Sequence, residues 1–183
     1  MRTGVTWALV IVWAALIGCA VVSILEPPWL ARLSEPGKDT EALSFRQRGD
    51  QLMRDGNYAG AMEWYERALR VLPENTITRV NLAIAHGRGG SPQQGIRVLH
   101  EALATDPAGR GTILYNLAEL YRQMGDRDRA VQYYQEALAA DGTPELIQAR
   151  LGELFAERGE LEAARAALAE AIRCREDPAA AYR

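Results

Sequence analysis

The fold is decided by the stretch that spans residues 111–144, GTILYNLAELYRQMGDRDRAVQYYQEALAADGTP. Its apolar residues recur every three or four positions, which predicts two amphipathic helices, at 111–124 and 127–140. Gly125 stands between them, where a left-handed backbone is needed to end the first helix and glycine adopts it readily. The stretch therefore predicts a helical hairpin.

The same hairpin recurs on both sides of this stretch. Glycines equivalent to Gly125 stand at 56, 90 and 159, so the four are spaced by 34, 35 and 34 residues. Small residues at 61, 95, 130 and 164 keep the same spacing, including the one-residue slip near Arg110. Because a hairpin of this length cannot bury its own apolar face, its neighbours must cover it. We therefore predict an all-α solenoid of four repeats, at 42–75, 76–109, 111–144 and 145–178, and a tail at 179–183. The other helices are expected at 42–55, 58–72, 76–88, 92–105, 144–157 and 161–175.

This pattern resembles the tetratricopeptide repeat (TPR) family, whose unit is a 34-residue helix-turn-helix with a W-x2-L-G-x2-Y…A-x3-F…P pattern. The first repeat carries the resemblance in Gly49, Leu52, Gly56, Tyr58, Ala61, Tyr65, Ala68 and Pro73. The chain departs from the pattern at Arg48, where leucine is usual, and at His86, where an aromatic residue is usual. We expect a looser core in the first two repeats for that reason. Helix starts are also marked, since Ser91-Pro92 and Thr143-Pro144 place a capping residue before a proline.

In this family the first helix of each hairpin lines a groove that binds a protein or peptide. The resemblance places the following residues in it: Arg46, Asp50, Arg54, Ile77, Val80, Asn81, Ile84, Arg88, Tyr115, Asn116, Glu119, Arg122 and Glu153, with Thr112, Gln123, Leu146, Ala149 and Glu157 as further groove positions. This order makes the predicted groove basic at one end, apolar in the middle and acidic at the other, which suits a peptide of mixed polarity. Some relatives grip a C-terminal carboxylate with a Lys/Asn clamp. We expect no such clamp here, because Asp50, Thr112 and Asn116 replace its residues.

A second feature lies ahead of the repeats. The run from Val5 to Leu25 contains no charged residue. As a helix it would be about 31 Å long, which matches the hydrocarbon core of a membrane. Trp7 and Trp29 stand near its ends, where amphipathic rings prefer the headgroup region. We therefore predict a short tail and a single-pass transmembrane anchor in residues 1–25, and a linker in residues 26–41.

Two other interpretations of the apolar run stay open. A cleaved secretory signal would need a shorter apolar stretch and an A-x-A-like site. The segment Leu16-Ile17-Gly18-Cys19 resembles a bacterial lipobox, which would make Cys19 a lipidation site, although the apolar run continues to Leu25. Length favours the uncleaved anchor. Either the anchor or the lipoprotein would place the repeats outside the cytoplasm, in a bacterial periplasm.

Charge and histidine usage argue against several functions. The net charge is −3, so there is no basic footprint for nucleic acid. The two histidines, His86 and His100, fall on helical packing positions, and no cysteine or acidic cluster shares their spacing. We therefore expect neither a metal nor a cofactor, and no nucleophile–base pair for an enzyme with a small-molecule substrate.

The leading hypothesis is a membrane-tethered adaptor, or scaffold, that helps to assemble an envelope protein complex. Exported, anchored members of the family resemble factors for cytochrome c maturation, periplasmic dehydrogenase assembly, or pilus and outer-membrane assembly. The alternative is a repeat lipoprotein acylated at Cys19 that acts in pilus or outer-membrane assembly. A hypothesis of another class is a structural subunit that associates with itself through the alanine-rich last helix, which carries Ala163, Ala166, Ala167 and Ala169.

Overall fold

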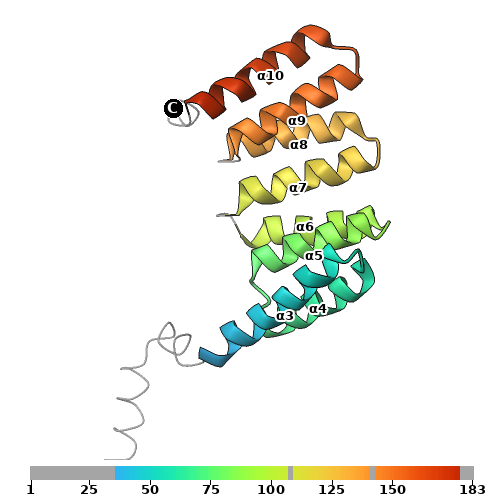
Figure 1. Cartoon of the computed structure of the whole chain (residues 1–183), viewed down its shortest axis with the longest axis vertical. Helices are drawn as coiled ribbons and strands as arrows, with labels where there is room; N and C mark the ends of the chain where they lie inside the picture. The colour runs from blue at the N-terminus through green and yellow to red at the C-terminus, as the bar shows by residue number, and fades with distance from the viewer. Residues whose placement is uncertain (1–35, 107–108, 141–142, 178–183) are drawn as a thin grey trace, which may run out of the picture. The chain divides into compact units, whose positions relative to one another are not determined.

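A computed structural model describes residues 36–106, 109–140 and 143–177 (Figure 1). These residues form eight helices and confirm the predicted hairpins, with most helix ends within one or two residues of the expected ones. The helices are α3 (Pro36–Arg54), α4 (Tyr58–Val71), α5 (Thr76–Arg88), α6 (Pro92–Thr105), α7 (Arg110–Gln123), α8 (Arg127–Ala139), α9 (Pro144–Glu157) and α10 (Leu161–Glu176).

The first helix departs most from the prediction. It begins at Pro36, six residues ahead of the expected start, so residues 36–41 of the predicted linker are helical. Proline suits a helix start because its missing N–H would have no partner there, and Asp39 in the first turn complements the helix dipole. The predicted tail, the anchor with Cys19 and the rest of the linker lie outside the described residues. Within the described ranges, no helix combines the length and the apolar character needed to cross a bilayer.

Within the unit that spans Glu41–Arg183, each hairpin packs on the next. The two helices of a hairpin contact each other in α5–α6, α7–α8 and α9–α10, and successive hairpins meet through α4–α5, α6–α7 and α8–α9 (Figure 1). The crossing of α5 and α6 depends on a missing side chain. A Cβ atom at Gly95 would lie 2.6 Å from the carbonyl oxygen of Ala83, so only glycine allows the two backbones to come this close.

The turns inside the hairpins confirm the predicted role of the repeated glycines. All four have a left-handed backbone, with φ between 75° and 83°. In each turn the residue after the glycine donates its N–H to a carbonyl five residues earlier, as from Asp126 to Tyr121 at 2.9 Å, which satisfies a helix-end carbonyl. The predicted caps are only half right. Ser91 and Thr143 stand at the N-cap before a proline, but their side chains make no capping hydrogen bond within the described chain.

The core consists of two neighbouring clusters of buried side chains. The larger one runs through α5–α10 and includes Leu114, Leu117 and Tyr134, all 0% exposed. The smaller one joins the first two repeats around Tyr65. Val98 packs against both clusters, so the core is continuous from repeat to repeat.

The outer face of α3 explains one departure from the family pattern. Three positions that hold buried apolar residues in α7 (Ile113, Leu117 and Leu120) hold Ser44, Arg48 and Gln51 in α3, and these three are exposed. Arg48 therefore causes no loose core. It belongs to a polar face at the first repeat, where a solenoid needs a surface that tolerates water. We call Ser44, Arg48 and Gln51 the polar face of α3.

The two histidines differ in their surroundings. His86 is half-buried, and burial lowers the pKa of its imidazole. Its Nδ1 atom is buried without a hydrogen-bond partner among the described residues. His100 lies on the second helix α6 and is exposed, with its ring 6.1 Å from that of Tyr133. Among the residues placed by the structure, no group of three or more His, Cys, Asp or Glu side chains could hold a metal ion.

Candidate protein-binding groove

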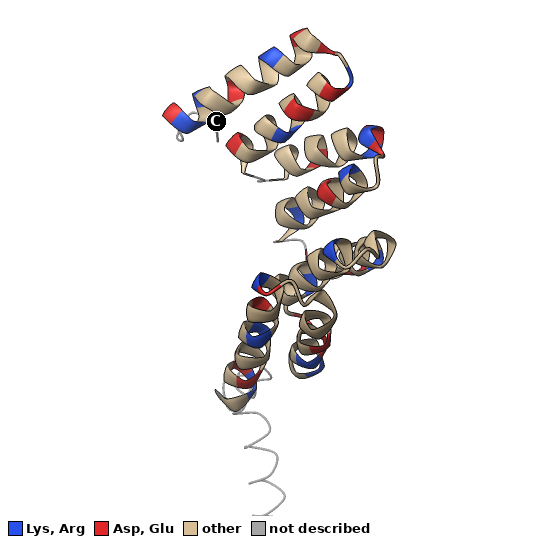
Figure 2. Ribbon diagram, turned by 45° about the vertical axis from the view of Figure 1, so that its right-hand side comes forward, with Lys and Arg blue, Asp and Glu red and all other residues tan. Residues whose placement is uncertain are grey.

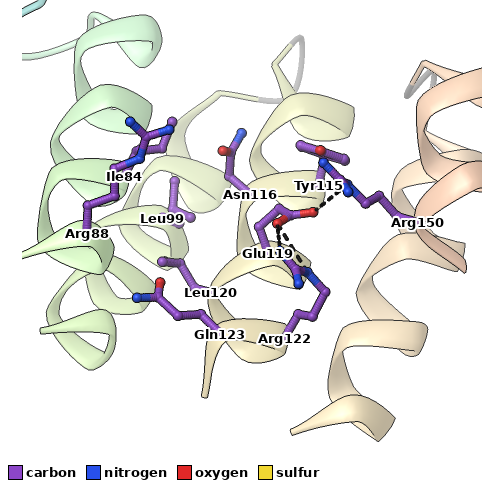
Figure 3. Close-up of a pocket in the computed structure, with 10 residues that line it drawn as sticks. All are labelled: Ile84, Arg88, Leu99, Tyr115, Asn116, Glu119, Leu120, Arg122, Gln123 and Arg150. Atoms are coloured by element: carbon purple, nitrogen blue, oxygen red, sulfur yellow. Dashed lines mark hydrogen bonds and ion pairs between the residues drawn. The ribbon is translucent and has the colours of Figure 1, made fainter. Parts of the chain in front are cut away.

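Two adjacent cavities lie along the first helices of the hairpins. The central cavity has a volume of about 520 Å³ and is shown in Figure 3. Its lining residues are Ile84, Arg88, Leu99, Tyr115, Asn116, Glu119, Leu120, Arg122, Gln123 and Arg150. The second, which we call the α3 cavity, has about 340 Å³ and is lined by Asp50, Met53, Arg54, Tyr65, Asn81, Ile84 and Arg88. Because Ile84 and Arg88 line both cavities, we treat the two as one groove.

Asp50 organises the α3 cavity. Its Oδ1 atom accepts a hydrogen bond from the Tyr65 hydroxyl at 2.7 Å and another from the Asn81 amide at 3.0 Å. These contacts join α3, α4 and α5. Burial, together with the hydrogen bond to the Asp50 carboxylate, raises the pKa of Tyr65, so its hydroxyl stays protonated and donating. Among the described residues, the amide oxygen of Asn81 accepts no hydrogen bond.

Glu119 organises the central cavity (Figure 3). It accepts a hydrogen bond from the Tyr134 hydroxyl and one from Arg122 Nη2 at 2.8 Å, and Arg150 Nε lies 3.3 Å from its Oε1 atom. Burial by itself would raise the pKa of Glu119, but the hydrogen bonds and the two guanidinium groups outweigh it and lower the pKa below its ordinary value. Glu119 is therefore a charged but internally satisfied group.

Arg150 changes the predicted charge of the groove. It reaches the central cavity from α9 and also forms an ion pair with Glu153 at 2.8 Å. The predicted acidic end is therefore wrong, because Glu119 and Glu153 are both paired with arginine. Three arginines, Arg88, Arg122 and Arg150, line the central cavity beside a single carboxylate.

Most of the predicted groove residues come together in the two cavities. Those that line them are Asp50, Arg54, Asn81, Ile84, Arg88, Tyr115, Asn116, Glu119, Arg122 and Gln123. Eight others take no part in the described cavity walls: Arg46, Ile77, Val80, Thr112, Leu146, Ala149, Glu153 and Glu157. Val80 is a core residue, only 6% exposed, and Arg46 is half-buried. Ile77 is 60% exposed and Glu153 is exposed, both outside the two cavities.

The residues that the sequence analysis missed are Met53, Tyr65, Leu99, Leu120 and Arg150. Tyr65 and Leu99 belong to second helices, which the family pattern assigns to packing. The repeat spacing carried a signal for Arg150, because it stands 34 residues after the groove residue Asn116. A separation of 15 residues also pairs each carboxylate of the cavities with a tyrosine, Asp50 with Tyr65 and Glu119 with Tyr134.

The groove alternates between polar and apolar repeats. Asp50–Tyr65 in the first repeat and Glu119–Tyr134 in the third occupy equivalent positions. In the second repeat the same positions hold Ile84 and Leu99, which line the central cavity. The groove therefore offers an apolar centre between two hydrogen-bonded acid–tyrosine pairs.

The environment of the central cavity shifts the pKa values of its carboxyl and phenol groups. Here the pKa of Glu119 is lowered, and burial raises the pKa values of Tyr115 and Tyr134. Each group is thus shifted away from neutral pH, which leaves the groove as a surface of fixed charges and hydrogen-bonding groups.

The fold and the groove define a helical-repeat solenoid with a binding surface along its first helices. Models of the tetratricopeptide repeat match residues 42–75 and 113–148, so the chain contains tetratricopeptide repeats, as the sequence pattern predicted. Repeats of this family mediate protein–protein interactions.

Solved structures share this fold. MamA 41-end from Desulfovibrio magneticus RS-1 superposes with a TM-score of 0.62 at 15% identity, over 78% of this chain and 80% of that one. The TPR2AB-domain:pHSP90 complex of yeast Sti1 superposes with a TM-score of 0.60 at 21% identity, over 68% of this chain and 50% of that one. Identities this low establish likeness of fold alone.

Curated relatives are similar over the repeats. Homo sapiens FK506-binding protein-like is 31% identical over 69% of this chain and 38% of its own length. Photosystem I assembly protein Ycf3 of Synechococcus sp. (strain CC9902) is 26% identical over 68% of this chain and 53% of its own length. The chain thus spans between about a third and about half of these relatives.

Proposed function

We propose that this chain is a non-enzymatic adaptor that binds a segment of a protein partner in its groove. The observation that carries the proposal is the place of Arg88. This exposed arginine lies where the two cavities join, beside the apolar side chain of Ile84. Among the described residues it has no ion pair or hydrogen bond, so its charge is available to a ligand. By contrast, the cavity carboxylates Asp50 and Glu119 already accept hydrogen bonds from Tyr65 and Tyr134.

The charge of the groove indicates the chemistry of the segment. Four arginines (Arg54, Arg88, Arg122 and Arg150) line the two cavities, against the carboxylates of Asp50 and Glu119. An extended segment with an acidic side chain next to an apolar one fits this surface, since the acid meets Arg88 and the apolar side chain meets Ile84. We infer an acidic and apolar segment, which specifies the peptide of mixed polarity predicted from the sequence.

The relatives support a role in bringing proteins together. The Sti1 structure is a complex with pHSP90, and Ycf3 is a photosystem I assembly protein. For this chain we propose assembly of an envelope complex, with residues 5–25 as the anchor and the repeats in the periplasm. The support is the uncharged apolar run from Val5 to Leu25. Anchoring would confine the groove to the membrane surface and raise its effective concentration for a partner there.

The groove is tested by capture of partners with the full chain. Crosslinking in cells of the source organism, followed by affinity purification and quantitative mass spectrometry, compares wild type with Arg88→Glu. The matched control is Arg70→Glu, since Arg70 is an exposed arginine on α4 outside both cavities. We expect Arg88→Glu to lose the proteins that wild type and Arg70→Glu retain. Equal capture by all three chains would refute the groove.

The anchor is tested separately. Metabolic labelling with a fatty acid and the mature mass distinguish a span from a lipoprotein, with Cys19→Ser as the comparison. A plain anchor predicts no label and an unprocessed mass in both chains. Label and processing that disappear in Cys19→Ser would establish the lipoprotein instead. Protease digestion of spheroplasts then shows on which side of the membrane the repeats lie. Digestion of the repeats supports the periplasmic location, and protection contradicts it.

A further inference from the structure

The two ends of the repeat array carry opposite surfaces. At the C-terminal end, α10 exposes Leu161, Leu168 and Ile172, at 69%, 42% and 50% of their surface. Their spacing of 7 and 4 residues places them on one stripe of the helix. We call these three residues the α10 ridge. At the other end stands the polar face of α3.

Comparison along the repeats indicates that the ridge is built like a buried surface. Leu168 is equivalent by repeat spacing to Tyr65, Leu99 and Tyr134, which are at most 1% exposed because another hairpin follows them. Leu168 itself packs on Gly152, where a Cβ atom would lie 2.6 Å from Leu168 Cγ. The predicted alanine surface of α10 is smaller than expected, since Ala167 is buried and Ala163 half-buried. The large apolar residues, not the alanines, dominate the exposed stripe.

A second copy does not complete this surface by stacking head to tail. Its α3 would have to present the polar face, with Arg48, to the ridge. Burying an unpaired guanidinium against leucine and isoleucine is costly. The two ends of the array therefore do not complement each other.

The charges beside the ridge fit a different arrangement. Arg165 and Glu176 flank it on the same side, and 11 residues place them about 16 Å apart along the helix. Both are exposed, and neither forms an ion pair within the described residues. When two α10 helices pack antiparallel about a two-fold axis, Arg165 of each copy faces Glu176 of the other. Leu168 and Ile172 then lie at the centre of the contact.

We propose that the α10 ridge is a self-complementary interface through which two copies of this chain dimerise, α10 against α10. This goes beyond binding in the groove, because no ridge residue lines either cavity within the described structure. Each dimer presents two free grooves. Two linked grooves bind a partner with two such segments more tightly than one groove does, when the spacing allows both to engage.

The test is crosslinking of the full chain, purified in detergent with Cys19→Ser as background. Ala169→Cys places a thiol beside the proposed axis, opposite Ile172 of the second copy. Its control is Ala139→Cys, an exposed alanine on α8. A short bismaleimide is expected to join two chains through residue 169 several-fold more than through residue 139. Equal yields at both positions, as chance encounters in a micelle would give, overturn the proposal.

A charge exchange tests the pairing itself, in the Ala169→Cys background. Arg165→Glu and Glu176→Arg each place like charges together and are expected to lower the crosslinked dimer several-fold, while the double variant restores it. Ile172→Asp is expected to abolish it. Circular dichroism confirms that each variant is folded. A double variant with a yield as low as the single ones rejects the antiparallel pairing.

Discussion

Repeats 1 and 3 carry the same chemical device in different settings. Both hold a carboxylate bonded to a tyrosine 15 residues later, Asp50 with Tyr65 and Glu119 with Tyr134. In repeat 1 the other donor to the carboxylate is the neutral Asn81, whereas in repeat 3 Arg122 and Arg150 surround it. The faces of α3 and α7 differ too, since α3 carries Arg48 at the position where α7 buries a leucine. Repeat spacing thus sets the local pairing, and the neighbouring hairpins set its charge and burial.

The largest expected effect on stability comes from placing in repeat 3 the arginine that repeat 1 carries at the equivalent position. Leu117 is 0% exposed and occupies in α7 the position that Arg48 occupies in α3. Leu117→Arg would bury an unpaired charge, and we expect it to lower the free energy of unfolding by about 3–5 kcal/mol. Urea denaturation followed by circular dichroism measures the change. A wild-type denaturation curve would contradict the repeat equivalence.

A smaller effect is expected where α7 and α8 cross. Ala137→Leu adds volume at a fully buried position of the larger core cluster, and overpacking should cost about 1–3 kcal/mol. Ala68→Leu makes the same change in repeat 1, outside that cluster, and should cost less because, among the described residues, no hairpin packs on the outer side of this repeat. Thermal melting of both variants gives the comparison. A larger loss of stability in Ala68→Leu than in Ala137→Leu would contradict this expectation.

The third prediction concerns pH and the carboxylate of repeat 3. The folded-state pKa of Glu119 lies below the ordinary value of 4.5. Its ionised form therefore stabilises the protein above that value, and this contribution disappears as the pH falls through the folded pKa. We expect the stability difference between wild type and Glu119→Gln to shrink as the pH is lowered from 7 to 3. Glu153→Gln, which also removes a partner of Arg150, serves as the control. A difference independent of pH would mean that the ionised form contributes nothing.

The smallest effect is expected on the polar face of α3. Arg48→Leu restores the residue that is usual in the family at an exposed site, so stability should change by less than about 0.5 kcal/mol. Urea denaturation again measures it. A gain of several times that amount would show that Arg48 lies in a core and that α3 does not end the array with a water-facing surface.

Much of the groove followed from the sequence. The family resemblance, extended by the repeat spacing, placed ten residues that line the two cavities, from Asp50 to Gln123, because equivalent positions on stacked helices share a face. The predicted groove positions of Val80 and Ile77 were wrong, because repeat spacing assigns a residue to a helix face but does not show how deeply the neighbouring hairpin buries that face. Arg150 escaped because the groove positions of repeat 4 were assigned to Leu146, Ala149, Glu153 and Glu157. Only the tertiary structure brings its guanidinium from α9 to Glu119 of α7.

The sequence by itself determined the hairpins, their turns and their order. These depend on local periodicity, on glycines with a left-handed backbone and on small residues at helix crossings. Only the tertiary structure decided the charge of the groove, the burial of the carboxylates and the contrast between the polar α3 end and the apolar α10 end. Those properties depend on contacts between hairpins, such as those of Asn81 with Asp50 and of Arg150 with Glu119. The distances and exposures that control their electrostatics are set by how one hairpin packs on the next.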